Sequence, residues 1–405
     1  MFNVQFKTAS GEYVFNTLSG ALVKIDSADF LERIIAESEE NENFGAIKRK
    51  GFIVRKSFDE FGYILQMTNY HIYNKFPQNV SYTILTNRNC NFNCFYCFEH
   101  NNDGVKLDVD STYRFIKEEI RRNPSLKHVR ITWFGGEPLL NRSPIEELTD
   151  KLTPVMEERK IRYTGSVVTN GSCVDAEFLK KNKITSIQIT LDGEEQINCR
   201  YKGISPDMYR RVVSNIEEIA NEESIELALR LNCDRNNTES VFDVISMLES
   251  RNLLDKMYVY LAPIYTETEA DLSDEEFSAL KKRYNEYLKE KNHKDLLMKQ
   301  LHKSRFMSCG FMGYGSYVID ADGTLKKCER DVGIDDKIIG NTVEGKFYNS
   351  LELSYQENDI IGKCKTCTFY PLCRGGCRNL RDSGKQIDCE VLRKEIIDLL
   401  QLIAG

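Results

Sequence analysis

The sequence has little of what marks an exported, membrane-bound or nucleic-acid-binding protein. Its first residues, MFNVQFKTASGEYVF, lack the basic start and the continuous apolar stretch of a signal peptide. No later run approaches the roughly 18 apolar residues that a membrane-spanning helix needs. The 55 basic and 62 acidic residues give a net charge of −7, which offers no broad basic surface to DNA or RNA. We therefore expect a cytoplasmic protein with no nucleic-acid and no membrane partner.

Histidine is also scarce, whereas cysteine is abundant. The five histidines are scattered, and none has the spacing of a metal-ligand pair. Thirteen cysteines are an odd and large number for a reducing compartment, where disulfides do not persist. Clustered thiols in such a chain indicate metal or redox chemistry. With 405 residues and 41% hydrophobic residues, the chain can form two or three domains, each with its own core.

Residues 1–75 are predicted to form a small α/β unit. Segments 11–17 (GEYVFNT) and 21–26 (ALVKID) have the composition of two strands joined by a turn, and 29–38 is predicted to be helical. Segment 51–56 (GFIVRK) is predicted to be a third strand. No catalytic constellation is evident in this part of the chain.

Six apolar runs then alternate with helical segments, which predicts a parallel sheet built from βα units. The runs are 81–86, 128–134, 163–169, 185–191, 225–231 and 257–262. Parallel neighbours need long crossover connections, and strands that are apolar along their length are covered on both faces. We therefore predict an α/β fold with a partial six-stranded barrel over residues 76–300. The glycine- and cysteine-rich residues 301–405 are predicted to be a small domain built around metal.

The residues with unusual chemistry directly follow these predicted strands. Chemistry in parallel α/β folds gathers at the carboxyl ends of the strands, so these residues are expected to face one mouth. They are residues 87–97, Gly135, Gly136, Glu137, Pro138, Asn170, Gly171, Asp192, Gly193, Arg230, Asn232 and Pro263.

The stretch CNFNCFYC places Cys90, Cys94 and Cys97 on one predicted loop. Thiolates at this spacing can converge on one metal centre, and soft sulfur ligands favour zinc or an iron–sulfur cluster. A closed site needs four protein ligands, so three thiolates leave one metal position open to another molecule. A structural zinc knuckle, with GGEP as an ordinary turn, is the simpler alternative.

The same stretch resembles the Cys-x3-Cys-x2-Cys loop of radical S-adenosylmethionine (SAM) enzymes, including the aromatic Tyr96 before the third cysteine. The resemblance implies that Cys90, Cys94 and Cys97 bind a 4Fe–4S cluster whose open iron chelates SAM, which is cleaved to a 5′-deoxyadenosyl radical. GGEP at 135–138 resembles the family motif that contacts the SAM amino group. The resemblance further implies SAM-supporting roles, on looser matches, for Asn170, Asp192, Arg230 and Asn232.

The C-terminal cysteines resemble the SPASM domain that a subset of these enzymes carries, with two auxiliary 4Fe–4S clusters. The resemblance implies that Cys364, Cys367, Cys373 and Cys389 bind an outer cluster. It assigns Cys309, Cys328 and Cys377 to an inner cluster. No further cysteine lies between Cys309 and Cys328, so this inner cluster is expected to have an open iron. Zinc in these sites is the alternative, and Cys173, Cys199 and Cys233 are expected to be inert thiols.

Glu329 directly follows Cys328 and is a candidate catalytic base, since a carboxylate beside the barrel mouth could take a proton from a substrate radical. In sulfatase-maturing members of the family an aspartate occupies this place, so the glutamate is a departure. An ordinary surface or ion-pairing role is the alternative.

The leading hypothesis from the sequence is a radical SAM/SPASM peptide maturase that closes an intrapeptide crosslink in a ribosomally made precursor. A thioether from a substrate cysteine is the crosslink that we expect. Residues 1–75 resemble winged-helix-like leader-peptide recognition domains, which bind a leader as an added strand. The alternative for these residues is a cap without a ligand. The expected partners are a precursor peptide with a leader and an electron donor such as flavodoxin or ferredoxin. An anaerobic sulfatase-maturing enzyme and a non-enzymatic zinc-binding adaptor remain as alternatives.

Overall fold

The computed structural model describes residues 1–37, 42–99, 104–347, 350–356, 362–385 and 387–405. Its contacts divide the chain into two compact units. The first comprises residues 1–73, 274–309 and 357–405, and the second comprises 74–273 and 310–356. The predicted division into domains at residues 75 and 300 stays a prediction.

The second unit is built around one large sheet, in which β4 to β9 are parallel and lie in sequence order. These strands coincide, within a few residues at each end, with the six predicted apolar runs, so the α/β fold with a parallel sheet is confirmed. The strands are β4 (Asn79–Leu85), β5 (His128–Phe134), β6 (Arg162–Thr169), β7 (Ile184–Leu191), β8 (Glu226–Cys233) and β9 (Tyr258–Pro263).

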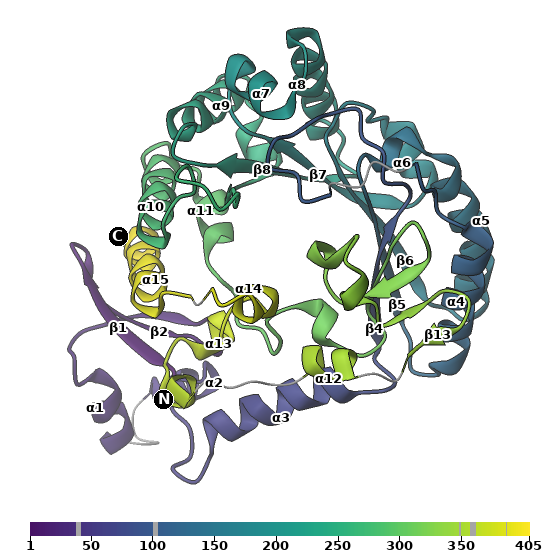
Figure 1. Ribbon diagram of the computed structural model, residues 1–405. Helices are drawn as coiled ribbons and strands as arrows, with labels where there is room; N and C mark the ends of the chain where they lie inside the picture. Colours follow the sequence, from purple (N-terminus) through teal and green to yellow (C-terminus); the bar gives the residue numbers. More distant parts are fainter. Residues whose placement is uncertain (38–41, 100–103, 348–349, 357–361, 386) are drawn as a thin grey trace. The chain divides into compact units, whose positions relative to one another are not determined.

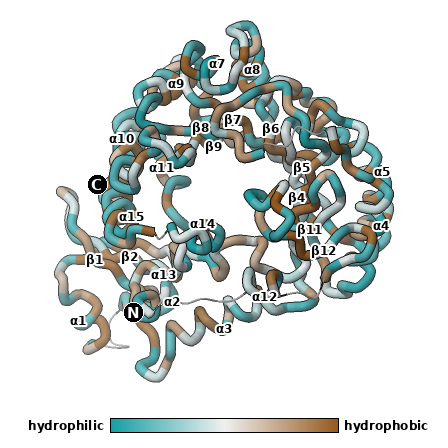
Figure 2. Tube along the Cα trace, in the orientation of Figure 1, coloured by the Kyte–Doolittle hydropathy of each residue, from teal (hydrophilic) through white to brown (hydrophobic). Residues whose placement is uncertain are grey.

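Helices cover one face of this sheet, as the βα connections require. Figure 1 shows α4, α5, α6, α8 and α9 along the outer face of the curved sheet. Figure 2 shows brown, hydrophobic positions along β4 and β5 and teal positions on the helices outside them. The helices are α4 (Val109–Arg122), α5 (Ser143–Glu158), α6 (Ala176–Lys181), α7 (Glu195–Lys202), α8 (Pro206–Ala220) and α9 (Thr238–Ser250), with short 3-10 turns η2 (Pro138–Leu140) and η3 (Leu254–Lys256).

Four short strands that the sequence analysis did not predict extend the sheet beyond β4. The first of them, β10, runs parallel to β4, and an antiparallel ladder follows it. These elements are β10 (Tyr317–Ile319), β11 (Thr324–Lys326), β12 (Gly340–Asn341) and β13 (Gly345–Lys346), with η4 (Gly310–Met312), η5 (Glu329–Asp331), η6 (Asp335–Lys337) and α12 (Ser350–Gln356). Strands of two or three residues carry too little periodicity to be recognised in a sequence.

The first unit combines the N-terminal and C-terminal parts of the chain. Its three-stranded antiparallel sheet has the order β1 (Asn3–Thr8), β2 (Gly11–Asn16) and β3 (Leu22–Ile25). Its helices are α1 (Phe30–Glu37), α2 (Phe44–Arg49), α3 (Glu60–Tyr73), α10 (Asp274–Glu290), α11 (Lys294–Gln300), η7 (Gly362–Thr366), α13 (Tyr370–Cys373), α14 (Arg378–Asp382) and α15 (Cys389–Ala404).

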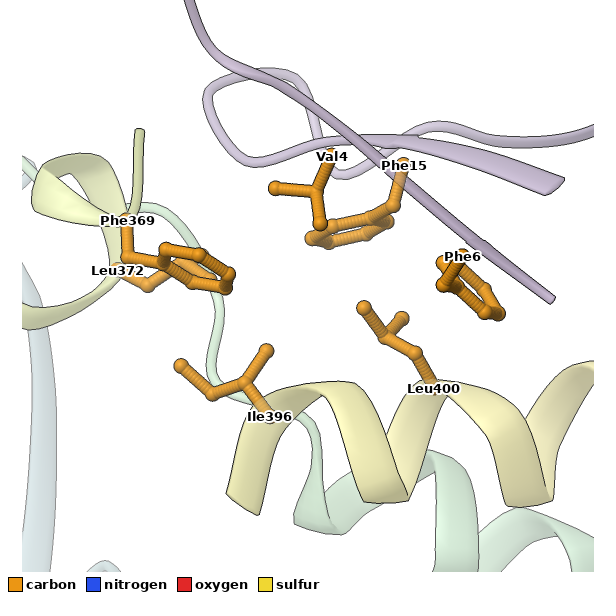
Figure 3. Packing of buried hydrophobic residues seen from close by; sticks show 7 residues of the cluster. All are labelled: Val4, Phe6, Phe15, Phe369, Leu372, Ile396 and Leu400. Atoms are coloured by element: carbon orange, nitrogen blue, oxygen red, sulfur yellow. The ribbon is translucent and has the colours of Figure 1, made fainter. Parts of the chain in front are cut away.

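A shared hydrophobic cluster joins the two ends of the chain within this unit (Figure 3). Side chains of β1 and β2 pack against side chains of α13 and α15 and the residue that precedes α13. The cluster consists of Val4, Phe6, Phe15, Phe369, Leu372, Ile396 and Leu400. The N-terminal sheet and the C-terminal cysteine-rich segment therefore stabilise each other.

The prediction of a strand at 51–56 is wrong. This segment follows a turn at Gly51 (φ 83°) and is irregular, whereas the third strand of the sheet is β1. Phe52 is buried and Val54 is exposed, so the apolar run of the sequence belongs to a loop that buries one aromatic ring. The carbonyl of Phe52 accepts a hydrogen bond from the side chain of Asn3 instead of a strand partner.

Candidate active site

The loop that carries Cys90, Cys94 and Cys97 follows β4, at the carboxyl end of the parallel sheet. All three thiols are partly exposed. The start of the loop is anchored by Arg88, which pairs with Asp320 at 3.0 Å and with Asp322 at 2.6 Å. The loop therefore leaves the sheet with its first cysteine held near the turn between β10 and β11.

The end of α7 supports the middle of this loop through backbone hydrogen bonds. The amide of Asn93 donates to the carbonyl of Lys202 at 2.9 Å, and the amide of Phe95 donates to the carbonyl of Tyr201 at 3.2 Å. Gly203 ends the helix in the left-handed conformation, and a Cβ on it would lie 3.2 Å from Asn93. The helix end and the cysteine loop are thus in direct contact.

Tyr96 and three of the predicted SAM-supporting residues, Asp192, Arg230 and Asn232, meet in one largely buried polar network. The Tyr96 hydroxyl bonds to Asp192 at 2.6 Å and accepts from Asn232 at 3.1 Å. The amide of Asn232 also donates to Asp192, and its oxygen accepts from Arg230 at 2.8 Å. The fifth member, Lys202, was not predicted from the sequence, and its ammonium lies 3.3 Å from Asp192. A lysine at a helix C-terminus is common, so its position in the sequence gave no signal.

The GGEP segment packs against the beginning of the cysteine loop. A Cβ on Gly135 would lie 2.2 Å from the carbonyl oxygen of Asn87, and one on Gly136 would lie 2.4 Å from that of Asn89. The amide of Glu137 donates to the carbonyl of Asn89 at 2.8 Å. Both glycines are therefore required because the backbone of the chain itself approaches closely.

The carboxylate of Glu137 is fully buried and joins two loops. It accepts hydrogen bonds from the Thr169 hydroxyl and the Asn170 amide, each at 2.7 Å, and from the Leu139 amide at 3.0 Å. Burial raises the pKa of Glu137, and these hydrogen bonds lower it. Pro138 begins η2 directly after it. The side chain of Asn170 in turn lies 3.7 Å from the Cys90 sulfur. Contact of Glu137 with a SAM ammonium stays a prediction.

The three loop thiols titrate above their ordinary range. Burial raises the pKa of Cys90 to about 11 and also raises the pKa values of Cys94 and Cys97. The charge of Lys202 acts in the opposite direction on both Cys94 and Cys97. Thiolates are the form that binds metal, so this nearby cation favours the ligand form.

Glu329 lies on η5, where its carboxylate accepts a hydrogen bond from Thr83 of β4 at 3.0 Å. Burial raises the pKa of Glu329, whereas Thr83 and the charge of Arg230 lower it. A second carboxylate, Glu99, was missed by the sequence analysis. Burial, with the charges of Asp320 and Glu329, raises the pKa of Glu99 to about 7. The catalytic role of Glu329 stays a prediction.

The four cysteines assigned to an outer cluster line one cavity of about 40 Å³ in the first unit. Burial raises the pKa of Cys364, and the neighbouring thiols of Cys373, Cys367 and Cys389 raise it further. The guanidinium of Arg393 donates to the Cys367 sulfur at 3.4 Å. The predicted ligand set is therefore brought together by the fold. Four thiols around one cavity fit a fully ligated cluster.

The three cysteines assigned to the inner cluster are divided between the units. Cys309 and Cys377 belong to the first unit and are exposed, whereas Cys328 belongs to the second unit. Their joint ligation of one cluster stays a prediction.

Within the described part of the chain, no three His, Cys, Asp or Glu side chains lie close enough to hold a single metal ion. No described helix has the length and apolar character needed to cross a membrane.

Comparisons with known proteins identify a family for the part of the chain that carries this site. Residues 84–274 match the Radical SAM superfamily, and this range contains the cysteine loop, GGEP and the polar network. A cysteine-type anaerobic sulfatase-maturating enzyme of Clostridium novyi (strain NT) is 24% identical over 330 residues, which are 73% of this chain and 86% of that protein.

Solved structures share the fold. The structure of native anSMEcpe with bound AdoMet and a Cp18Cys peptide has a TM-score of 0.63 and 21% identity, and covers 80% of this chain and 98% of its own. Streptococcus suis SuiB bound to the precursor peptide SuiA has a TM-score of 0.55 and 16% identity, and covers 95% of this chain and 96% of its own.

Proposed function

Because this chain is a radical SAM enzyme, we propose that it modifies a ribosomally made precursor peptide and closes a crosslink within it. A thioether from a substrate cysteine is the bond that we expect. The hypothesis of a zinc-binding adaptor without enzymatic activity is wrong, since the chain is an enzyme.

One observation carries this proposal: the similarity to SuiB extends over 95% of the chain, whereas the similarity to anSMEcpe extends over 80%. Almost 90 residues precede the first cysteine of the loop, and they include the three-stranded sheet β1–β2–β3. Among the described strands, β3 pairs only with β2, so an extended leader peptide could add beside it.

The residues of the loop fit a 4Fe–4S cluster because three thiols on one segment leave one iron without a protein ligand. When bound, the cluster and SAM would supply a 5′-deoxyadenosyl radical that removes hydrogen from the peptide. The chain itself would orient these groups. Asp192 and Asn232 bind Tyr96 of the loop, and Glu137 holds Asn170 against Cys90.

Glu99 and Glu329, two half-buried carboxylates of the second unit, are the candidates to take a proton from the substrate. The charge of Glu329 contributes to the raised pKa of Glu99, and the Glu99 Oε2 atom is buried without a hydrogen-bond partner among the described residues. We propose Glu329 as the base, with Thr83 as the donor that orients it. The cluster would be reduced by an electron donor such as flavodoxin or ferredoxin.

Sulfatase maturation is the second candidate, and the Clostridium novyi relative favours it. One difference bears on the choice. The chain has a glutamate at position 329, where the family resemblance expects aspartate in sulfatase maturases. A sulfatase maturase would act on a short peptide that carries the sulfatase Cys or Ser motif without any leader.

The decisive experiment is the intact mass of a candidate precursor peptide, encoded beside this gene, after anaerobic incubation with the enzyme, SAM and a reductant. Each crosslink removes two hydrogens, so a loss of about 2 Da per link is expected. The same reaction is run with the leader removed from the peptide and with a short sulfatase-type cysteine peptide. Modification of the full precursor alone supports the proposal, and modification of the short sulfatase peptide alone contradicts it.

The leader should be removed from the peptide and not from the enzyme. Deleting residues 1–75 would remove Val4, Phe6 and Phe15 from the core that they share with α13 and α15. Each buried aromatic or branched side chain contributes about 1.5–3 kcal/mol, so the deletion would unfold the first unit together with the outer cysteine cavity. A loss of activity in such a truncated enzyme would not report on leader recognition.

A further inference from the structure

Lys202 is a buried cation in direct contact with the cysteine loop. Its side chain is 3% exposed, and its ammonium lies 3.1 Å from the Tyr96 hydroxyl and 5.8 Å from the centre of the Tyr96 ring. The partner carboxylate of Asp192 is fully buried. Lysine is rarely buried to this degree unless it is paired, and removing both charges from water is costly.

Neither hydrogen bonding nor support of the loop explains this burial. Asp192 already accepts hydrogen bonds from the Tyr96 hydroxyl and the Asn232 amide, so its oxygens have neutral donors. The loop is held by the backbone carbonyls of Tyr201 and Lys202, and any side chain at position 202 would leave these carbonyls in place. A buried ion pair adds little net stability.

The remaining contribution of Lys202 to the site is its positive charge. Lys202 influences the thiols of both Cys94 and Cys97, and the backbone bonds from Asn93 and Phe95 fix its distance from the loop. An iron–sulfur cluster becomes more negative by one charge when it is reduced, and its potential depends on the charge around it. A fixed cation beside the ligands stabilises the reduced state relative to the oxidised state.

We infer that Lys202 tunes the cluster held by Cys90, Cys94 and Cys97, making it easier to reduce, with Asp192 setting the size of the effect by partly neutralising the ammonium. The inference rests on these three cysteines being the ligands and is independent of the peptide that the enzyme modifies.

The test is a redox titration of the full chain with reconstituted clusters, followed by electron paramagnetic resonance in the absence of SAM. The signal of the loop cluster is identified in a parallel sample by its change when SAM is added. In Lys202→Met, the ratio of reduced to oxidised loop cluster at a fixed applied potential should fall about tenfold, which is about 59 mV for a one-electron couple. Asp192→Asn should shift the ratio in the opposite direction.

The controls separate charge from packing. Lys202→Arg keeps the charge and should stay within about twofold of the wild type, and the double variant Lys202→Met/Asp192→Asn should return towards it. Tyr201 is the residue next to Lys202 in the chain. Tyr201→Phe removes the hydroxyl that donates to Asp234 without changing any charge, and it should leave the reduction potential of the loop cluster unchanged. An equal shift in Tyr201→Phe would assign the effect to packing and overturn the inference.

Two further outcomes are decisive. An unchanged or higher potential in Lys202→Met would overturn the inference. Should Lys202→Met lose its iron, Asp192→Asn decides alone: a rise in potential supports the inference and no change overturns it. A wild-type chain that forms no SAM-responsive cluster would overturn the assignment of the three cysteines and the inference with it, a result distinct from a cluster with an unshifted potential.

Discussion

The loop of Cys90, Cys94 and Cys97 lies beside a buried ion pair of opposite charges, whereas the charged residues that line the cavity of the four C-terminal cysteines are all basic. The loop has three thiols and, around them, donors and acceptors contributed by loops after several strands. The C-terminal cavity has four thiols with the basic Lys363, Arg381 and Arg393.

This difference indicates two kinds of site. Three ligands with many nearby polar groups suit a metal centre that also binds a polar molecule, because that molecule needs partners of its own. Four ligands around a small cavity suit a centre whose coordination is complete. Basic side chains beside the second site offset the negative charge that four thiolates bring to a cluster.

Removing one loop thiol should have the largest effect. Cys94→Ala is expected to lower 5′-deoxyadenosine formation by more than about 1,000-fold, because SAM cleavage needs an electron from the cluster. Product formation is measured by chromatography of anaerobic reactions. Cys199→Ala, on α7 and outside both cysteine groups, is the matched control and should retain activity. Substantial SAM cleavage by Cys94→Ala would contradict the assignment of the loop.

Replacing the buried carboxylate that joins the strand-end loops should have the next largest effect. In Glu137→Gln, the side-chain NH2 group is a donor and would face at least one of the donors Thr169, Asn170 and Leu139, so a hydrogen bond would be lost. The free energy of unfolding is expected to fall by about 2 kcal/mol, measured by urea denaturation. Glu146→Gln on α5, whose carboxylate pairs with Lys181 at the surface, should change it by less than about 0.5 kcal/mol. Equal losses in the two variants would show that the buried network does not stabilise the fold.

The C-terminal cavity should respond in iron content more than in SAM cleavage. If three equal clusters are bound, Cys389→Ala should lose about one third of the iron while SAM cleavage at the loop stays within about tenfold of the wild type. Iron is measured by a colorimetric assay. Cys233→Ala, which alters a buried thiol of β8, should lose none. A loss of loop activity as complete as that of Cys94→Ala would remove the distinction between the two sites.

The smallest expected effect concerns the helix that presents Cys389. Asp388 caps α15 by accepting from the amides of Val391 and Glu390, which lower its pKa below the ordinary value of 3.8. A lowered pKa in the folded state stabilises the protein above the unfolded pKa, and the contribution is lost as the pH falls through the folded value. Asp388→Ala should therefore lower the melting temperature by a few degrees at pH 7, and this difference should shrink below about pH 4.

Asp388→Asn is the control for this last prediction. Asparagine is also a good N-cap, and its amide does not titrate, so its stability relative to the alanine variant should not change with pH. A pH-independent difference between Asp388→Ala and the wild type would contradict the role of the carboxylate.

Much of the fold could be predicted because the hydrophobic runs of the sequence coincide with the strands of the parallel sheet. The six parallel strands were predicted from apolar runs in the sequence, and in the structure buried positions alternate along β5 and β7 with positions that are less buried. The prediction of a strand at 51–56 was wrong because Phe52 is buried although it lies in a loop. The strand β1 was missed although Val4 and Phe6 alternate with polar residues in the sequence, which is a local signal of a half-buried strand. The short strands β10 to β13 depend on a sheet edge formed by β4, far away in the sequence.

The amino-acid sequence by itself determined the spacing of the thiols, the glycines of GGEP and the order of the polar residues at the strand ends. Spacing is a property of the chain, and only a few geometries satisfy three cysteines within eight residues. Only the tertiary structure decided which charges surround them. Lys202 and Asp192 lie ten residues apart around α7, and Glu137 and Asn170 follow different strands. Their contacts arise because parallel strands bring their carboxyl ends to one edge of the sheet.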